Sequence, residues 1–162
     1  MTFLELQSRG DEHFAWGRRY YAKGGFMRAI TGETIAALLD LVADAQTPDS
    51  ELYFLQLGGA VADVAEDATA YSGRNAEFYW IAEPVWDDPA DDERCMAWGR
   101  MAGRRLAKMS MEANYVNEQG DAGKEVAMRA YGATKYERLA RLKARFDPSN
   151  LFRLNQNIEP KV

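Results

Sequence analysis

Residues 76–86 read AEFYWIAEPVW, a run of aromatic and apolar residues that predicts one long β-strand. Pro84 has no backbone N–H to donate, so we expect the later part of this strand to lie at a sheet edge or at a bulge. Further β-rich stretches predict extended segments around it, at residues 13–27, 51–59, 61–75 and 111–117. The first should bend at Gly24-Gly25, and the third should give way to a loop.

Between these predicted strands lie segments whose apolar residues recur at helical spacing. Thr31 has the position of an N-cap for a helix that should end near Thr47-Pro48, and a second helix should run from about Asp91 to Met109. Two more are predicted at 122–131 and 133–146, separated at Gly132 and ended by Pro148. Short turns between neighbouring strands favour antiparallel pairing. The sequence therefore predicts an α+β fold, an antiparallel sheet covered by helices on one face, with C-terminal helices and an extended tail.

Composition narrows the class of protein. The chain has 162 residues, 47% of them hydrophobic, and a net charge of -5, which fits one globular domain over 1–162 and argues against nucleic acid or an anionic membrane as partner. One cysteine (Cys95) and one histidine (His13) exclude a disulfide within the chain and argue against a metal site. No run is apolar enough to span a bilayer and the N-terminal residues do not resemble a signal peptide, so we expect a cytoplasmic protein.

The C-terminal residues NLFRLNQNIEP (150–160) are unusual for a tail. Four apolar residues alternate there with side-chain amides, so one side of the segment is apolar and the other offers hydrogen-bond donors and acceptors. This pattern predicts that the tail docks against a partner.

The stretch YGATKYERLARLKARFDPSNLFRLNQNI (131–158) strongly resembles the C-terminal segment of the berberine bridge enzyme-like FAD-linked oxidases. Residues 114–121 (NYVNEQGD) fit the Tyr-x-Asn strand of that family, and residues 69–92 and 16–27 fit its substrate domain. By this resemblance, 1–110 form part of the substrate domain and 111–162 the berberine-type segment. The sequence departs from the family at Gly73, where His is usual, and at Glu118, which replaces a second tyrosine.

The resemblance implies FAD as cofactor, held in the family by an FAD-binding domain that precedes this region. Neither Gly24-Gly25 nor Gly58-Gly59 forms the G-x-G-x-x-G turn that cradles phosphates, so we do not expect this chain alone to bind FAD tightly. The implied partners are an FAD-binding domain or a second copy of the chain, together with a small-molecule substrate. Without that domain, the tail beyond about Phe152 should be poorly ordered or held by a second copy.

The resemblance also assigns roles to residues. Tyr115 is the implied catalytic base. Cofactor-binding residues are implied at Asn117, Asn155 and Asn157, and substrate-binding residues at Tyr79, Trp80 and Glu83. Residue chemistry leaves other roles open, because Tyr115 also suits a half-buried sheet, the asparagines suit turns and caps, and an aromatic strand is often core. On a strand, Tyr115 and Asn117 share one face, as do Tyr79 and Glu83, whereas Trp80 points to the other.

The implied function is oxidation of an alcohol, sugar or secondary-metabolite substrate by hydride transfer to flavin, with the protein providing the base and the orientation. A phenol ordinarily titrates near pH ~10, so a tyrosine base needs hydrogen bonds or positive charge around it. The alternative is a non-enzymatic dimerisation or partner-binding module derived from such an oxidase, because the face that meets the FAD domain would expose apolar surface.

Overall fold

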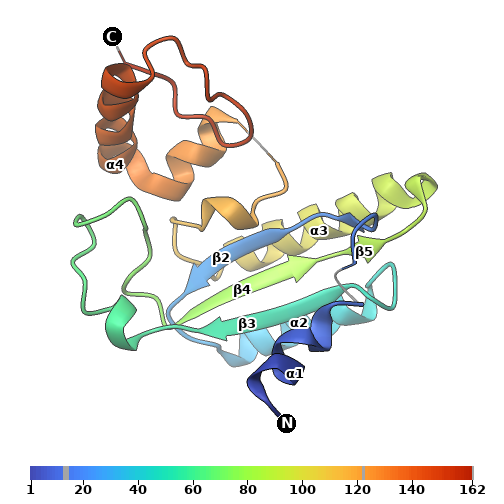
Figure 1. Ribbon diagram of the computed structural model, residues 1–162. Helices are drawn as coiled ribbons and strands as arrows, with labels where there is room; N and C mark the ends of the chain where they lie inside the picture. The colour runs from blue at the N-terminus through green and yellow to red at the C-terminus, as the bar shows by residue number, and fades with distance from the viewer. Residues whose placement is uncertain (13–14, 122, 162) are drawn as a thin grey trace.

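Strand β4 (Phe78–Glu83) is the central strand of a three-stranded antiparallel sheet in the computed structural model, which describes residues 1–12, 15–121 and 123–161 (Figure 1). It pairs on one side with β2 (Lys23–Met27) and on the other with β3 (Glu51–Gln56), so the sheet order is β2-β4-β3. Beyond Pro84, β5 (Val85–Trp86) leaves this sheet and pairs with β1 (Arg19–Tyr20). The predicted interruption at Pro84 is confirmed, and the α+β class is confirmed. His13 lies outside the described residues.

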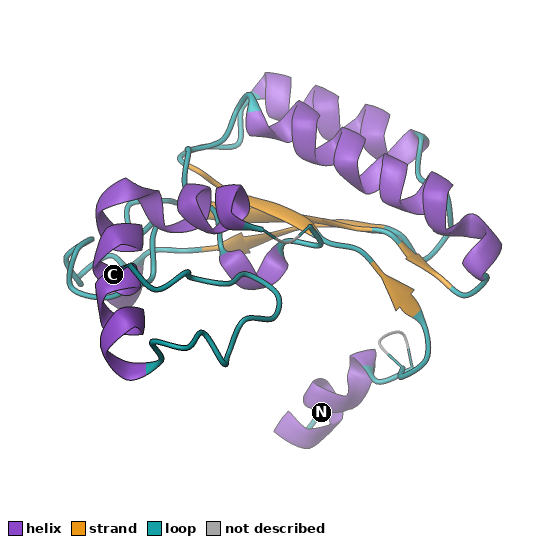
Figure 2. Cartoon of the chain, turned by 90° about the horizontal axis from the view of Figure 1, so that it is seen from above, coloured by secondary structure: helices purple, strands orange, loops and turns teal. Residues whose placement is uncertain are grey.

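Helices α2 (Gly32–Ala43) and α3 (Asp92–Ala107) pack side by side over one face of the sheet (Figure 2). Thr31 caps α2 as predicted, with its hydroxyl accepting from the backbone N–H of Thr34, but the helix ends at Ala43, before the predicted end near Thr47. Helix α3 confirms the prediction for residues 91–109 within two residues at each end. No helix in the described part of the chain is both long and apolar enough to cross a membrane.

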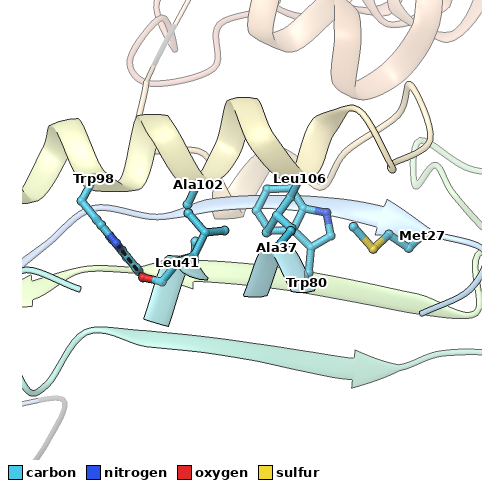
Figure 3. Close-up of a cluster of buried hydrophobic side chains, with 8 residues drawn as sticks. Met27, Ala37, Leu41, Trp80, Trp98, Ala102 and Leu106 are labelled. Atoms are coloured by element: carbon cyan, nitrogen blue, oxygen red, sulfur yellow. Dashed lines mark hydrogen bonds between the residues drawn. The ribbon is translucent and has the colours of Figure 1, made fainter. Parts of the chain in front are cut away.

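The main core lies between these helices and the sheet (Figure 3). Its fully buried members come from α2, α3 and the strands: Met27, Ala37, Leu41, Trp80, Ala82, Trp98, Ala102 and Leu106. The indole N–H of Trp98 donates to the backbone oxygen of Leu41 at 3.1 Å, which ties α3 to α2. Burying each large side chain of this kind stabilises the fold by about 1.5–3 kcal/mol.

Gly24 and Gly25 lie inside straight strand β2, so the predicted bend at this pair is wrong. A Cβ on Gly24 would collide with the phenol of Tyr79, and one on Gly25 would lie 2.9 Å from the indole nitrogen of Trp80. The two glycines therefore give aromatic side chains of β4 room to lie across β2. They serve side-chain packing and do not form a turn.

Two predicted strands are absent from segments that the structure describes in full. Residues 61–75 form turns after a 3-10 helix at Gly59–Val61, and residues 111–117 form a loop followed by a 3-10 helix at Val116–Glu118. The second segment still runs along the outer edge of β2. The backbone N–H of Met111 donates to Phe26 O at 2.8 Å, and that of Gly120 donates to Ala22 O at 2.7 Å.

Helix α4 (Lys124–Phe146) and the tail form a separate group beyond the sheet (Figure 1). The helix is broken at Gly132, whose φ of 72° and ψ of 160° are not helical, as predicted from the sequence. It ends before Pro148, also as predicted.

The tail packs against its own chain. The backbone N–H of Lys161 donates to Ala140 O at 3.2 Å, and the amide of Gln156 donates to the backbone oxygens of Gln119 and Asp121 at 3.2 and 2.9 Å. The expectation of a tail that is poorly ordered beyond Phe152, or held by a second copy, is therefore wrong. The amides of the tail find backbone partners in the segment that precedes α4.

Candidate functional site

The face of the sheet opposite α2 and α3 carries a cluster of aromatic rings, which we call the tyrosine cluster: Phe26, Tyr71, Tyr79 and Tyr115. Ring centroids of Phe26 and Tyr79 are 4.8 Å apart, those of Tyr71 and Tyr115 are 6.0 Å apart, and those of Tyr79 and Tyr115 are 6.3 Å apart. These are edge-to-face or tilted contacts at the spacing that aromatic pairs prefer. Three phenols thus come together from the 62–75 loop, β4 and the 111–121 segment.

Tyr115 is the most exposed member of the cluster, with 37% of its surface exposed. The side-chain amide of Asn117 donates to its phenol oxygen at 2.8 Å. The sequence predicted that these two side chains would lie together because strand side chains alternate. They do meet, but a 3-10 turn at Val116–Glu118 brings them together.

A pocket of about 330 Å³ opens beside Tyr115. Its polar side chains come from three segments: Tyr71, Ser72, Asn114, Tyr115, Asn117 and Tyr131. This is the lower end of the size range of small-molecule pockets, and it combines aromatic walls with a few polar groups, as such sites usually do.

Burial sets the protonation of the phenols around Tyr115. It raises the pKa of Tyr79 far above its ordinary value, and the negative charge of Glu118 adds to this. Burial likewise raises the pKa of Tyr71 and that of Tyr131. These three side chains are therefore neutral phenols at physiological pH. Tyr71 and Tyr131 line the pocket as hydrogen-bonding groups, whereas Tyr79 is buried behind Tyr115 and does not line it.

The loop that carries Tyr71 is fixed to α4 by Lys135. The Lys135 ammonium, only 14% exposed, donates to Glu66 Oε1 at 2.6 Å, Tyr71 O at 2.7 Å and Ser72 Oγ at 3.2 Å. Glu66 in turn accepts from the backbone N–H of Arg74 at 3.0 Å. The Arg74 guanidinium lies 5.2 Å from the centroid of the Tyr71 ring. This arrangement, which we call the Lys135 clamp, holds one wall of the Tyr115 pocket.

Sequence reasoning missed Tyr71, Tyr131 and the Lys135 clamp. Lys135 is one of many charged residues on an amphipathic helix, and its three acceptors are more than 60 positions away in the chain. No local pattern marks such a long-range contact.

The structure separates the other predicted site residues. Trp80 lies 2% exposed in the helix-side core and donates to Ser110 Oγ at 2.8 Å, on the opposite face from Tyr79. Glu83 ends β4 on the same face as Tyr53, and burial together with the charge of Glu83 raises the pKa of Tyr53 to about 12. Trp80 and Glu83 therefore do not line the Tyr115 pocket. Their substrate-binding role stays a prediction.

Asn155 and Asn157 lie on the tail and do not line the Tyr115 pocket either. Asn155 has a left-handed backbone with φ of 58°. The Oδ1 atom of Asn157 is buried and has no hydrogen-bond partner within the described residues. Their cofactor-binding role stays a prediction, as does that of Asn117.

Residues 114–159, which contain Tyr115, Asn117 and the tail, match the family profile "Berberine and berberine like". Two curated relatives match most of the chain. FAD-linked oxidoreductase YvdP of Bacillus subtilis is 28% identical over 146 residues, which are 90% of this chain and 30% of the relative. Aclacinomycin-N/aclacinomycin-A oxidase of Streptomyces galilaeus is 28% identical over 161 residues, 88% of this chain and 29% of the relative.

Solved structures share the fold. The flavoenzyme CrmK of caerulomycin biosynthesis matches 95% of this chain and 34% of its own, with a TM-score of 0.77 and 27% identity. Berberine bridge enzyme from Eschscholzia californica matches 89% of this chain and 33% of its own, with a TM-score of 0.75 and 19% identity, a level that speaks for the fold alone. The chain thus spans about a third of the length of the relatives it matches.

Proposed function

We propose that this chain, which is similar to berberine bridge enzyme-like FAD-linked oxidoreductases, forms the substrate-facing part of a flavin-dependent oxidase, with Tyr115 as the base. The substrate class is an alcohol, a sugar or a secondary metabolite that loses a hydride and a proton. The observation that carries the proposal is the Asn117–Tyr115 hydrogen bond of 2.8 Å on the wall of a pocket inside the family-matched segment.

The tail has chemistry that suits a flavin ring. The amide oxygens of Asn150, Gln156 and Asn157 are buried without a hydrogen-bond partner within the described residues. A buried acceptor that is left unsatisfied costs about 1–3 kcal/mol, so these oxygens favour a ligand with N–H donors, and the flavin ring offers one. Asn157, Asn155 and Asn117 are the residues that would hold FAD. When bound, FAD supplies the hydride acceptor.

The residues of this chain handle the proton. Tyr115 acts as the base in its phenolate form, which takes a proton from the substrate and becomes a neutral phenol. The amide N–H of Asn117 donates to the same oxygen and stabilises the phenolate. Tyr71 and Tyr131 stay neutral, so each can donate to a substrate oxygen and orient it. The closely packed rings of the tyrosine cluster exclude water behind the reacting atoms, which strengthens each of these hydrogen bonds.

A chimera tests the proposal. This chain would replace the matching third of the FAD-linked oxidoreductase YvdP, and the product would be purified, examined for flavin absorption and assayed for oxygen consumption with a panel of alcohols and sugars. We expect a yellow protein in which Tyr115→Phe keeps the flavin absorption and lowers kcat by about 10²–10⁴-fold. Tyr20→Phe, an exposed tyrosine of β1, is the matched control and should keep full activity. Equal activity of the Tyr115→Phe and Tyr20→Phe chimeras would refute the assignment.

A second candidate function is a partner-binding module without catalysis. Leu151, Phe152 and Leu154 are 67%, 77% and 84% exposed although hydrogen bonds fix the backbone beneath them. Ordered, exposed apolar side chains mark interaction surfaces. Analytical ultracentrifugation of the chain tests this. A stable dimer that Leu154→Ser converts to monomer, combined with a chimera that lacks flavin absorption, would favour this function over the oxidase.

A further inference from the structure

A second pocket, of about 290 Å³, lies where α3, β2 and residues 110–121 approach α4. It is distinct from the Tyr115 pocket, although Asn114 lines both. None of the residues that the sequence comparison implied for the flavin lines it, and of the implied substrate residues only Trp80 does.

The pocket is cationic in an acidic protein. Four basic side chains line it, Lys23, Arg100, Arg104 and Arg129, against two carboxylates, Glu112 and Asp121. The whole chain has a net charge of -5, so this excess of cations is local and concentrates anions from solution.

Asp121 neutralises one side of the pocket. Its carboxylate accepts from Lys23 at 2.8 Å and from Arg100 at 3.4 Å. Arg100 also lies over the Tyr21 ring, 5.2 Å from its centroid. These contacts hold Lys23 and Arg100 in place and do not involve Arg104 or Arg129.

Arg104 and Arg129 have no carboxylate partner within ranges 1–12, 15–121 and 123–161. Arg104 lies in the last turn of α3, where a cation also complements the helix dipole. The helix dipole does not account for Arg129, which lies in the second turn of α4 and not at its C-terminus. Two guanidinium groups from different helices thus line one pocket without an internal counter-ion, and guanidinium groups bind carboxylates through paired hydrogen bonds.

The inner wall of the pocket is apolar. Trp80, Ala107, Met111 and Ala113 line it, and Gly25 leaves space at the indole edge. An inorganic anion would gain nothing from such a wall, whereas an organic acid would bury its apolar body there.

We propose that this pocket binds a small organic carboxylic acid, with its carboxylate held between Arg104 and Arg129 and its apolar body against Trp80 and Met111. The site needs neither flavin nor the Tyr115 pocket, so it stands or falls independently of the oxidase proposal. Its volume of about 290 Å³ suits a ligand of the size of a single substituted ring.

The test uses the 162-residue chain with ¹⁵N label and no flavin. Sodium benzoate is titrated at constant ionic strength, and the indole N–H of Trp80 and the backbone amides of residues 110–114 are followed by NMR. Benzamide, which has the same ring without the charge, and inorganic phosphate, which has charge without the ring, are titrated in parallel. We expect saturable shifts with benzoate and much weaker ones with benzamide and phosphate.

Variants assign the contacts. Arg104→Gln and Arg129→Gln should each weaken benzoate binding by about tenfold, because each removes charge-assisted hydrogen bonds. Arg141→Gln is the matched control, an exposed arginine of α4 outside the pocket, and it should leave binding unchanged. No saturable benzoate shift would overturn the proposal. So would equal binding of benzamide, tighter binding of phosphate, or an equal loss of affinity in Arg141→Gln.

Discussion

The side-chain amide of Asn117 donates a hydrogen bond to the phenol oxygen of Tyr115 at 2.8 Å, across a single 3-10 turn. A donor aimed at that oxygen stabilises the phenolate, which is the form of Tyr115 that can take a proton. If Tyr115 is the base, Asn117 acts through it as a positioning residue, and the two residues should be coupled in their effect on the rate.

We predict that Asn117→Ala lowers kcat of the flavin-loaded chimera by about 10–100-fold, the effect of losing one hydrogen bond to a charged group. In a Tyr115→Phe background the same change should have almost no further effect, because its partner atom is gone. Asn75→Ala, an exposed asparagine of the loop before β4, is the control. Additive losses from the two changes would show that Asn117 does not act through Tyr115.

The Lys135 clamp should stabilise the fold measurably. Lys135→Met removes three hydrogen bonds from a nearly buried ammonium, and we expect the free energy of unfolding in urea to fall by about 1–3 kcal/mol. Lys161→Met breaks an exposed ion pair with Glu137 at 3.1 Å and should cost less than about 0.5 kcal/mol. If both variants lose the same stability, the clamp is no stronger than a surface pair.

The clamp also predicts a dependence on pH. Burial alone raises the pKa of Glu66, but the hydrogen bonds from Lys135 and from the backbone of Arg74 and Gly73 outweigh it, and the net pKa lies below the ordinary value of 4.5. A lowered folded-state pKa gives stability that is present above pH 4.5 and is lost as the pH falls through the folded-state value. Urea unfolding at a series of pH values from neutral to acidic should show this loss, and Lys135→Met should show less of it. An unchanged slope in the variant would contradict the mechanism.

Three helix boundaries were predicted correctly because the sequence signals that mark them are local. The Thr31 cap, the break at Gly132 and the stop at Pro148 each depend on a backbone geometry that one residue determines. Strand signals depend on neighbours. Within residues 111–117 only Tyr115 and Val116 are strong β-formers. Backbone hydrogen bonds join the ends of the 111–120 stretch to Phe26 of β2 and to Ala22 just before it.

In the candidate site, too, the sequence predicted the local contacts and not the long-range ones. The sequence brought Tyr115 and Asn117 together, although through a strand that does not form. It could not supply Tyr71, which reaches Tyr115 from a loop more than 40 positions upstream. It also could not place the tail, because side-chain amides suit either a partner or the chain itself, and here Gln156 bonds to backbone oxygens of residues 119 and 121.

Asp147 shapes the turn that follows α4. Its carboxylate accepts from the backbone N–H of Leu151 at 2.8 Å and of Phe152 at 3.1 Å, and it pairs with Lys143 at 2.5 Å. We predict that Asp147→Ala speeds hydrogen exchange at the Leu151 and Phe152 amides and leaves the amides of β4 unchanged. The Lys143 contact lowers the pKa of Asp147, so in the unmodified chain the same amides should lose protection only as the pH falls below about 3.8.

The control for this turn is Asp67→Ala, an aspartate in the exposed loop between β3 and β4. It should change neither amide. Protection at Leu151 and Phe152 that survives Asp147→Ala would mean that other contacts order the turn.

Two glycines should respond to alanine with opposite sign. Gly132 has φ of 72° and ψ of 160°, a region that is nearly exclusive to glycine, so Gly132→Ala should destabilise the chain by about 1–3 kcal/mol even though nothing lies within 4 Å of the added Cβ. Gly32 begins α2 in a helical conformation, also with open space around it, so Gly32→Ala should stabilise by about 0.4–1 kcal/mol. Thermal unfolding of the two variants against the unmodified chain measures both effects. Since the added Cβ of Gly132→Ala meets no steric neighbour, a Gly132→Ala variant as stable as the unmodified chain would contradict the break in α4, and a destabilised Gly32→Ala would contradict the helical conformation at Gly32.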